Sequence, residues 1–379
     1  MTRRHMLAGA LAAAAAPRSC RVAVADSAES LAAIAARHGR FFGAAVQAAQ
    51  LAAEPDLCAA VLTQCGVLTP EIALTWAVLE PAPGQFDVSP MDDLVAFAQR
   101  HGKRVHGHNL LWGRSLPNWV DSILRETHDW TVIARFFGSI IPRYGDVVHE
   151  WNVVNEMIDT GHRLDGLRQN VFLDVFGPSY IARALHEART FAPNARLLVN
   201  EFGLEYDLPE QRDRRYLLLK LLEKLRSENA PLDGFGMQSH LELGKGSISP
   251  KALDAFFDDV AGLGLSITIT ELDVKEWNYI ASPAERDLLV GDEVRRYLDV
   301  ALAHPAVLGV VTWGLSDRHS WLGVTKDDFA RFPGAWAHGD GPGSNRGLPL
   351  DVSLHPTPMF SAIAKALRAQ GRSAESASR

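Results

Sequence analysis

The chain has 379 residues, 47% of them hydrophobic and 22% charged, which is typical of a globular protein with a substantial core. Its net charge of −7 and the lack of a basic stripe in the sequence argue against a nucleic-acid partner, because such proteins hold phosphates with clustered Lys and Arg. The length allows two or three average domains, but a single α/β barrel of about 250 residues or more is a known alternative.

The first 25 residues have the features of an export signal. Two arginines, Arg3 and Arg4, precede an apolar stretch from Leu7 to Ala16, and Ala23-Val24-Ala25 offers a small-residue cleavage site. The apolar stretch is too short to remain as a membrane span. We therefore expect a twin-arginine signal over residues 1–25 and export to the periplasm or the medium. A disordered Ala-rich leader is the alternative.

Short apolar runs alternate with longer amphipathic stretches along the rest of the chain. This alternation predicts strands followed by helices, and eight such units predict a closed parallel (β/α)₈ barrel. An open doubly wound sheet is the alternative, but it usually carries a Gly-rich phosphate loop after an early strand, and none follows an early run here. The predicted strands are Phe41–Val46, Val67–Glu71, Arg104–Leu110, Val147–Glu156, Arg196–Phe202, Phe235–His240, Ser266–Asp273 and Val307–Gly314. The predicted helices include Met91–His101, Phe172–Phe191, Gln211–Ser227, Pro250–Leu263, Ala284–Ala303 and Pro358–Ala369.

Two glutamates lie at the carboxyl ends of apolar runs, Glu156 in the fourth and Glu271 in the seventh. Burying a carboxylate beside Val and Ile is costly unless it is hydrogen-bonded or its pKa changes. Strand ends meet on one face of a barrel, so the two can pair although 115 residues separate them. Retaining glycoside hydrolysis uses such a pair, with its carboxyls roughly 5–5.5 Å apart.

Other polar residues end neighbouring runs and support this interpretation. Asn155 precedes Glu156 and could donate to a sugar 2-hydroxyl, while Gln238 and His240 end the sixth run, beside the seventh in a barrel. We expect His240 to bridge Glu271 and Asp273 and to keep Glu271 ionised. The alternative for any one of these residues is that it only satisfies strand-end backbone.

Three tryptophans and two histidines complete the predicted face. Indole rings stack on the C–H faces of sugars, and Trp112, Trp313 and Trp321 lie at or beyond run ends. His106 and His108 are two apart, so on a strand they point to the same side. We expect His108 at the site and His106 in a deeper, hydrogen-bonded core position. No residue spacing indicates a metal site, and no cofactor is expected.

Cys58 and Cys65 are seven residues apart on or near one predicted helix. A helix through both would separate them by about 10 Å, which is too far for a disulfide. We expect both to be buried thiols.

The chain resembles the family 10 glycoside hydrolases, the barrel endo-β-1,4-xylanases, from about Leu31 to Ala369. The matching stretches are Gly39–Gly43, Leu68–Glu71, Gly107-His108, Leu116-Pro117 with Trp119, Trp151–Glu156, Asn200, Gln238–His240, Thr270–Asp273 and Trp313-Gly314 with Asp317, Ser320 and Trp321. The resemblance implies one catalytic domain, residues 26–379, that cleaves internal β-1,4-xylosidic linkages of a polysaccharide, with Glu156 as general acid/base and Glu271 as nucleophile. It implies that His108, Trp112, Asn155, His240, Trp313 and Trp321 line the subsite of the sugar being cleaved, and that Glu71 contacts the next sugar outward. We expect a monomer without a membrane span.

The chain departs from the family pattern on one side of the predicted site. Where the family usually has Asn and Lys after Thr-Pro-Glu, the chain has Ile72 and Thr75, and the usual Gln near Leu-Pro is Ser115. The usual Asp-Tyr after the fifth strand is Glu201-Phe202. Lost polar contacts can change substrate preference by an order of magnitude or more. A decorated xylan or another β-glycan is therefore an alternative substrate, and a non-catalytic glycan-binding protein is the alternative outside catalysis.

Two further features lie near these departures. Arg114 could meet an acidic substituent such as a uronic acid, although a solvent-exposed arginine is the simpler interpretation. Arg318–Arg346, with Arg331, Trp336 and His338, is expected to be a long loop over the same face.

Overall fold

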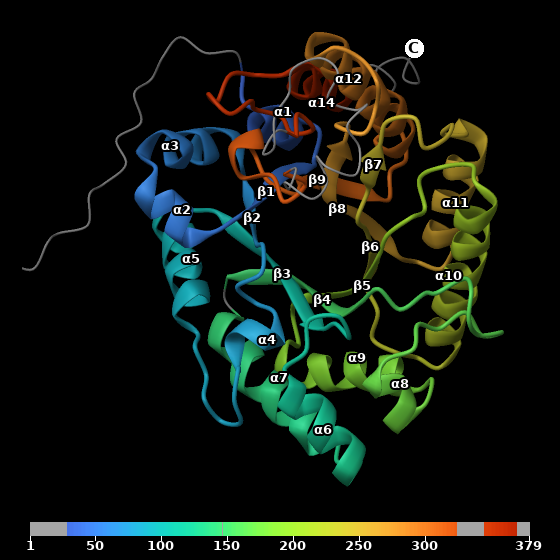
Figure 1. Ribbon diagram of the computed structural model, residues 1–379. Coiled ribbons are helices and arrows are strands. Elements are labelled where there is room, and N and C mark those ends of the chain that lie inside the picture. The colour runs from blue at the N-terminus through green and yellow to red at the C-terminus, as the bar shows by residue number, and fades with distance from the viewer. Residues whose placement is uncertain (1–28, 146, 324–344, 370–379) are drawn as a thin grey trace, which may run out of the picture.

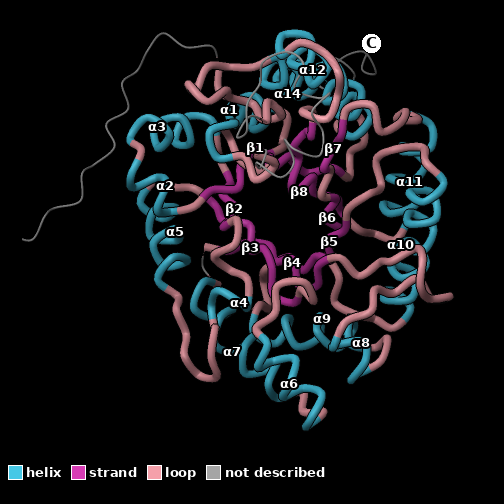
Figure 2. Tube along the Cα trace, in the orientation of Figure 1, coloured by secondary structure: helices cyan, strands magenta, loops and turns pink. Residues whose placement is uncertain are grey.

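The computed structural model describes residues 29–145, 147–323 and 345–369. Its strands form a closed ring of parallel strands, and the helices lie outside that ring (Figures 1 and 2). The predicted (β/α)₈ barrel is confirmed. The expected export signal over residues 1–25 and most of the expected long loop, residues 324–344, lie outside the described residues.

The sheet order is β6-β5-β4-β3-β2-β1-β9-β8-β7, and an additional pairing of β6 with β8 closes the barrel. In that closing pair Gly234 lies opposite Ser266 and Met237 opposite Ile269. The short β7 continues β6 after a break at Ser239, whose φ is +65°, so eight strand positions make the barrel. The strands are β1 (Phe41–Val46), β2 (Val67–Pro70), β3 (Arg104–Leu111), β4 (Val148–Asn155), β5 (Arg196–Glu201), β6 (Gly234–Met237), β7 (His240–Glu242), β8 (Ser266–Lys275) and β9 (Val307–Thr312).

The helices are amphipathic and bury one side against the barrel or a neighbouring helix. Several begin with a serine or asparagine whose side chain accepts a hydrogen bond from the first turn, as Ser249 does from the Ala252 N–H and Ser282 from the Glu285 N–H. The helices are α1 (Leu31–Arg37), α2 (Ala48–Ala53), α3 (Pro55–Gln64), α4 (Trp76–Leu79), α5 (Ser89–Arg100), α6 (Asn118–Thr127), α7 (Thr131–Tyr144), α8 (Val171–Phe176), α9 (Tyr180–Phe191), α10 (Pro209–Ser227), α11 (Pro250–Gly262), α12 (Pro283–Ala301) and α14 (Pro358–Ala369), with a 3₁₀ turn η1 (Asp317–His319).

The prediction of one continuous helix over Phe172–Phe191 is wrong. The structure divides it into α8 and α9 at Gly177, whose φ is +70°. Glycine adopts this left-handed conformation without a steric cost, and Pro178 follows it. The apolar periodicity continues across the break, which is why the pattern predicts a single helix.

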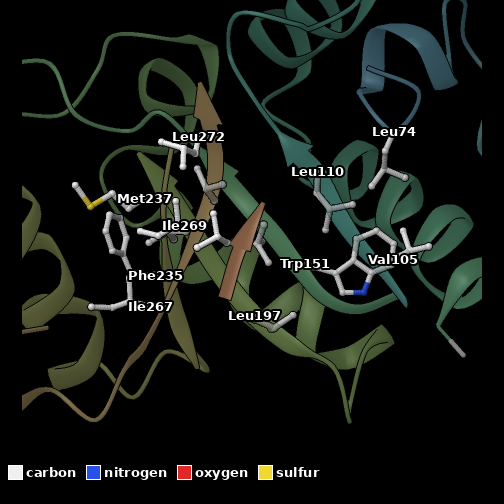
Figure 3. Close-up of a cluster of buried hydrophobic side chains, with 14 of the residues drawn as sticks. Leu74, Val105, Leu110, Trp151, Leu197, Phe235, Met237, Ile267, Ile269 and Leu272 are labelled. Atoms are coloured by element: carbon white, nitrogen blue, oxygen red, sulfur yellow. The ribbon is translucent and has the colours of Figure 1, made fainter. Parts of the chain in front are cut away.

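Alternation along the strands separates a polar interior from an apolar exterior. His106 and Glu150 point into the barrel, where the His106 Nδ1 lies 2.7 Å from Glu150 Oε1 and Arg196 pairs with the other carboxylate oxygen. The expected core position of His106 is therefore found. Outward-facing side chains fill the space between strands and helices, as Phe235 does against Phe256 of α11 at a ring distance of 6.1 Å. Figure 3 shows part of this layer, including Leu110, Trp151, Phe235, Met237, Ile267 and Ile269.

The two cysteines of the α3 region differ in their bonding. Cys65 is a free, buried thiol, and burial raises its pKa to about 12. The expectation for Cys58 is wrong, because Cys58 takes part in a disulfide bond. The helical spacing excludes only a bond between Cys58 and Cys65.

No helix within the described ranges is long and apolar enough to span a membrane.

Candidate active site

A cleft of about 580 Å³ opens at the carboxyl ends of the barrel strands. Every residue that the sequence predicts for the site lines this cleft, although the residues come from seven different strand ends or the loops after them. They are Glu71, His108, Trp112, Asn155, Glu156, Gln238, His240, Glu271, Asp273, Trp313 and Trp321. The strand ends converge because all barrel strands are parallel.

Glu271 lies inside β8 and is only 4% exposed. Burial alone would raise its pKa, but nearby polar groups, among them His240 and Asn200, outweigh burial and hold the pKa of Glu271 below its usual value. The Asn200 amide donates to Glu271 Oε1 at 2.7 Å, and His240 Nε2 lies 3.2 Å from Oε2. This carboxyl is therefore ionised and oriented at neutral pH.

His240 lies between two carboxylates. Its Nδ1 is 2.8 Å from Asp273 Oδ1, and its Nε2 faces Glu271. Burial would lower the pKa of His240, but Asp273 and then Glu271 raise it well above the ordinary value. The second Asp273 oxygen, Oδ2, accepts a 2.6 Å hydrogen bond from the Trp321 indole N–H, so Asp273 orients both rings.

Glu156 comes directly after β4 and has a φ of +57°, in the left-handed region that glutamate rarely adopts. The residue is 8% exposed, and its Oε2 has no hydrogen-bond partner among the described residues. Gln238 donates a long hydrogen bond of 3.5 Å to Oε1, and Arg114 Nη1 lies 3.7 Å from Oε2. The environment of Glu156 therefore differs from that of Glu271, which is held by three polar groups.

Asn200 links the two glutamates through Asn155. Its amide donates both to Glu271 Oε1 and to Asn155 Oδ1, at 2.7 and 2.8 Å. Gln238 also donates to Asn155 Oδ1, at 3.3 Å, and to Glu156. A continuous line of hydrogen bonds thus joins the carboxyls. The sequence matched Asn200 to a family position but assigned it no role; its signal is an asparagine within an otherwise apolar run.

Histidine and tryptophan rings form the walls near Glu271. His108 is 3% exposed, and burial lowers its pKa to about 4, so it is neutral at neutral pH. Its ring meets Trp313 edge-on at 5.1 Å. The Trp112 indole N–H is buried without a hydrogen-bond partner among the described residues, which leaves a donor for a ligand.

The departures from the family pattern lie at the Glu71 side of the cleft. Glu71 accepts a 2.7 Å hydrogen bond from Gln47, and burial raises its pKa. Ile72 is 51% exposed at the cleft wall. Thr75 is 2% exposed, and its hydroxyl donates to the Ile72 carbonyl oxygen at 2.9 Å. This side therefore presents an apolar side chain where the family usually presents polar ones.

Several cleft residues escape the sequence analysis. Leu241, Glu242, Lys245, Lys275 and Leu322 line the cleft in addition to Phe202. Leu241, Glu242 and Lys275 lie in the last residues of β7 and β8, and the other three lie in loops. None belongs to a recognisable motif. Arg114 also lines the cleft; its side chain is 62% exposed yet reaches Glu156. Among the described residues, no group of three or more His, Cys, Asp and Glu side chains is arranged to hold a metal ion.

A closed (β/α)₈ barrel with an acidic, tryptophan-lined cleft at the strand ends defines a class of barrel proteins that includes many hydrolases. Within that class the chain belongs to glycosyl hydrolase family 10, whose sequence pattern matches residues 30–366.

Individual relatives agree with this membership. The endo-1,4-beta-xylanase A of Phanerodontia chrysosporium is 32% identical over 265 residues, which is 69% of this chain and 61% of that protein. The endo-1,4-beta-xylanase of Agaricus bisporus is 29% identical over 307 residues, 79% of this chain and 88% of the relative. The chain thus spans about three fifths of the length of the Phanerodontia relative.

Solved structures share the fold. An endo-beta-1,4-xylanase of Gloeophyllum trabeum superposes with a TM-score of 0.75 at 27% identity, over 90% of this chain and 99% of that one. Xylanase 10B of Thermotoga maritima superposes with a TM-score of 0.76 at 24% identity, over 90% and 98% of the two chains.

Proposed function

We propose that this chain is a retaining endo-β-1,4-xylanase that cleaves internal linkages of xylan by double displacement. The observation that carries the proposal is the pair of buried carboxyls in contrasting environments at one cleft. Glu271 is held ionised by His240 and Asn200, while one oxygen of Glu156 has no hydrogen-bond partner in the part of the chain that the structure describes. Membership in family 10 and similarity to endo-1,4-beta-xylanases support the substrate.

In the first step Glu271 attacks the anomeric carbon, and Glu156 gives its proton to the glycosidic oxygen as the C–O bond breaks. The products are a glycosyl ester on Glu271 and a shortened chain with a free hydroxyl. Glu271 suits the nucleophile because His240 and Asn200 keep it charged, and their contacts with its two oxygens keep it oriented.

In the second step the ionised Glu156 takes a proton from water, and the oxygen of that water attacks the anomeric carbon. The ester bond to Glu271 breaks, and the sugar leaves with its original anomeric configuration. Each residue returns to its starting protonation state, so no cofactor is needed.

Substrate contacts follow from the groups that have no partner among the residues the structure describes. The Asn155 carbonyl oxygen already accepts from Asn200 and Gln238, so its amide nitrogen remains for a sugar hydroxyl. The buried indole N–H of Trp112 is a second donor. Trp313 and Trp321 offer ring faces or edges for sugar C–H groups, and Glu71 suits the next sugar outward.

The test of the mechanism is Glu271→Ala. We expect a loss of turnover of at least about 10³-fold with an unchanged fold, because the covalent intermediate cannot form. Azide should then restore part of the activity and yield a glycosyl azide of inverted configuration. Glu223→Ala, which removes an exposed carboxylate from α10, is the control. Full activity of Glu271→Ala would exclude the assignment.

The substrate is tested separately with a panel of β-glycans. Release of short xylo-oligosaccharides from xylan is the expected result. Ile72 and the inward-turned Thr75 remove polar contacts from one end of the cleft, so cleavage of a decorated xylan or another β-glycan in place of plain xylan would show that these changes redirect the enzyme. Binding of glycans without any cleavage would favour a non-catalytic protein.

We also propose that residues 1–25 are an export signal, that residues 26–379 form the exported catalytic domain, and that this domain is a monomer. The twin arginines and the Ala-rich stretch support export. N-terminal sequencing of the exported protein tests the cleavage site, and light scattering after gel filtration tests the monomer. A twin-lysine variant should remain inside the cell.

A further inference from the structure

The backbone that carries Glu156 is in an unfavourable conformation. Its φ of +57° lies in the left-handed region, which is unfavourable for a non-glycine residue and persists only when neighbouring contacts hold it. The chain leaves β4 here and enters a long loop that runs to α8 at Val171. What holds this turn determines where the Glu156 carboxyl lies.

Two arginines hold the carbonyl groups of the turn. Arg168 Nε donates to the Glu156 carbonyl oxygen and its Nη2 to that of Ile158, each at 3.0 Å. Arg214 of α10 donates to the same Ile158 oxygen at 2.8 Å. Arg214 is 5% exposed and Arg168 partly buried, so water competes little for these bonds.

Glu201 holds the N–H side of the same turn. Its Oε2 accepts from the Ile158 N–H at 2.8 Å, and its Oε1 accepts from the Phe202 N–H at 3.1 Å and lies 3.7 Å from Arg214 Nη1. Glu201 is the last residue of β5 and is fully buried. It therefore ties the turn after β4 to the neighbouring strand end.

Phe202 connects the two arginines. The guanidinium carbons of Arg168 and Arg214 lie 5.4 and 4.6 Å from its ring centre. Such contacts restrict the planes of both guanidinium groups. The Glu201-Phe202 pair is also one of the chain's departures from the family pattern.

We propose that Arg168, Glu201 and Arg214 are positioning residues that clamp the turn at Glu156 and so aim its carboxyl at the glycosidic oxygen. The proposal rests on the proposed function, in which Glu156 is the general acid. None of the three side chains needs to touch the substrate. Their effect acts on proton transfer, not on attack by Glu271.

Leaving-group dependence isolates this effect. A 2,4-dinitrophenyl group departs without protonation, whereas a phenyl group needs the acid, which contributes about 10²–10⁴-fold. We expect Arg168→Ala and Glu201→Gln to lower kcat/KM on phenyl β-xylobioside at least about tenfold and on the dinitrophenyl analogue by less than about threefold. Arg168→Lys, which keeps the charge but not the two-pronged donor, should show a smaller difference in the same direction.

Arg189→Ala is the matched control. Arg189 of α9 also donates to several backbone carbonyl oxygens, of Ala192, Pro193 and Ala195, but these precede the start of β5, at the opposite end of that strand from Glu201. The variant Arg189→Ala should change kcat/KM by the same factor on both substrates. Thermal unfolding shows whether each variant is folded. If Arg168→Ala does not fold, the variants Arg168→Lys and Glu201→Gln test the proposal.

Glu156→Ala separates failure of the clamp from failure of the proposed function. If Glu156→Ala shows no leaving-group selectivity, the general-acid assignment itself is wrong. If Glu156→Ala is selective, the clamp proposal is overturned by either of two results: the clamp variants lower kcat/KM equally on both substrates, or they leave kcat/KM unchanged on both.

Discussion

Individual side chains in the cleft owe their protonation states to their neighbours. His108 and His240 both lie near Glu271, yet burial lowers the pKa of His108 to about 4, while Asp273 and Glu271 raise that of His240. One imidazole is thus neutral and the other charged at neutral pH. The charged His240 in turn lowers the pKa of Glu271. A carboxylate held in this way is ready to act as a nucleophile over a wide pH range.

His240→Asn tests this coupling. The reactive form of Glu271 is ionised, so activity falls as the pH drops through its depressed pKa. Removing the cation raises that pKa, and the acid limb of kcat/KM should move to higher pH by about one unit or more. The pH profile should be measured on a 2,4-dinitrophenyl glycoside, since its first step does not need the proton of Glu156.

The control for this profile is His186→Asn on the exposed side of α9. Its acid limb should coincide with that of the unchanged protein. An acid limb that stays in place in His240→Asn would show that His240 does not control the ionisation of Glu271.

Each barrel strand places side chains both inside the barrel and in the layer between strands and helices. A glycine lies where the outer layer has no space for a side chain. Gly107 lies in β3 between the inward-facing His106 and His108. A Cβ atom there would come within 2.6 Å of the Trp151 ring and 2.8 Å of Val148. The missing side chain lets β3 and β4 bring their polar residues together inside the barrel while Trp151 packs outside.

Gly107→Ala should therefore lower the free energy of unfolding by about 1–3 kcal/mol, because overpacking forces the rigid Trp151 ring to move. Urea denaturation measures this. Gly262→Ala, at the end of α11, has nothing within 4 Å of the added methyl group and should be neutral or slightly stabilising. Equal stability of the two variants would contradict the packing argument.

Closure of the barrel brings distant parts of the chain into contact. At the β1–β9 seam, Arg318 of η1 reaches back across more than 260 residues to Glu54 and Asp56, at 2.7 and 3.1 Å. Its Nε also donates to the Val352 carbonyl oxygen at 2.9 Å. One partly buried guanidinium thus connects the β9 loop, the start of α3 and the segment before α14.

Arg318→Ala should lower the free energy of unfolding by about 1–2 kcal/mol, since it removes several charge-assisted hydrogen bonds at once. Arg295→Ala, which breaks only an i,i+4 pair with Asp299 within α12, should cost about 0.5 kcal/mol or less. Denaturant melts of both variants give the comparison. A cost for Arg318→Ala no greater than for Arg295→Ala would show that the seam contacts are not stabilising.

The amino-acid sequence alone was enough to predict the eight strands, several of the outer helices and most of the residues that line the cleft. Strand alternation and polar residues at run ends are local signals, and a parallel barrel brings all strand ends to one face. Local signals also misled, since the periodicity from Phe172 to Phe191 continues through the break at Gly177.

Other features depend on contacts between segments far apart in the chain. No spacing rule relates Arg168, Glu201 and Arg214, which meet at one turn only because a loop, a strand end and a helix converge there. Likewise, Arg114 is mostly exposed yet lies near Glu156, and Thr75 turns toward its own backbone. Hydrogen-bond partners and pKa values follow from three-dimensional neighbours, so they required the folded structure.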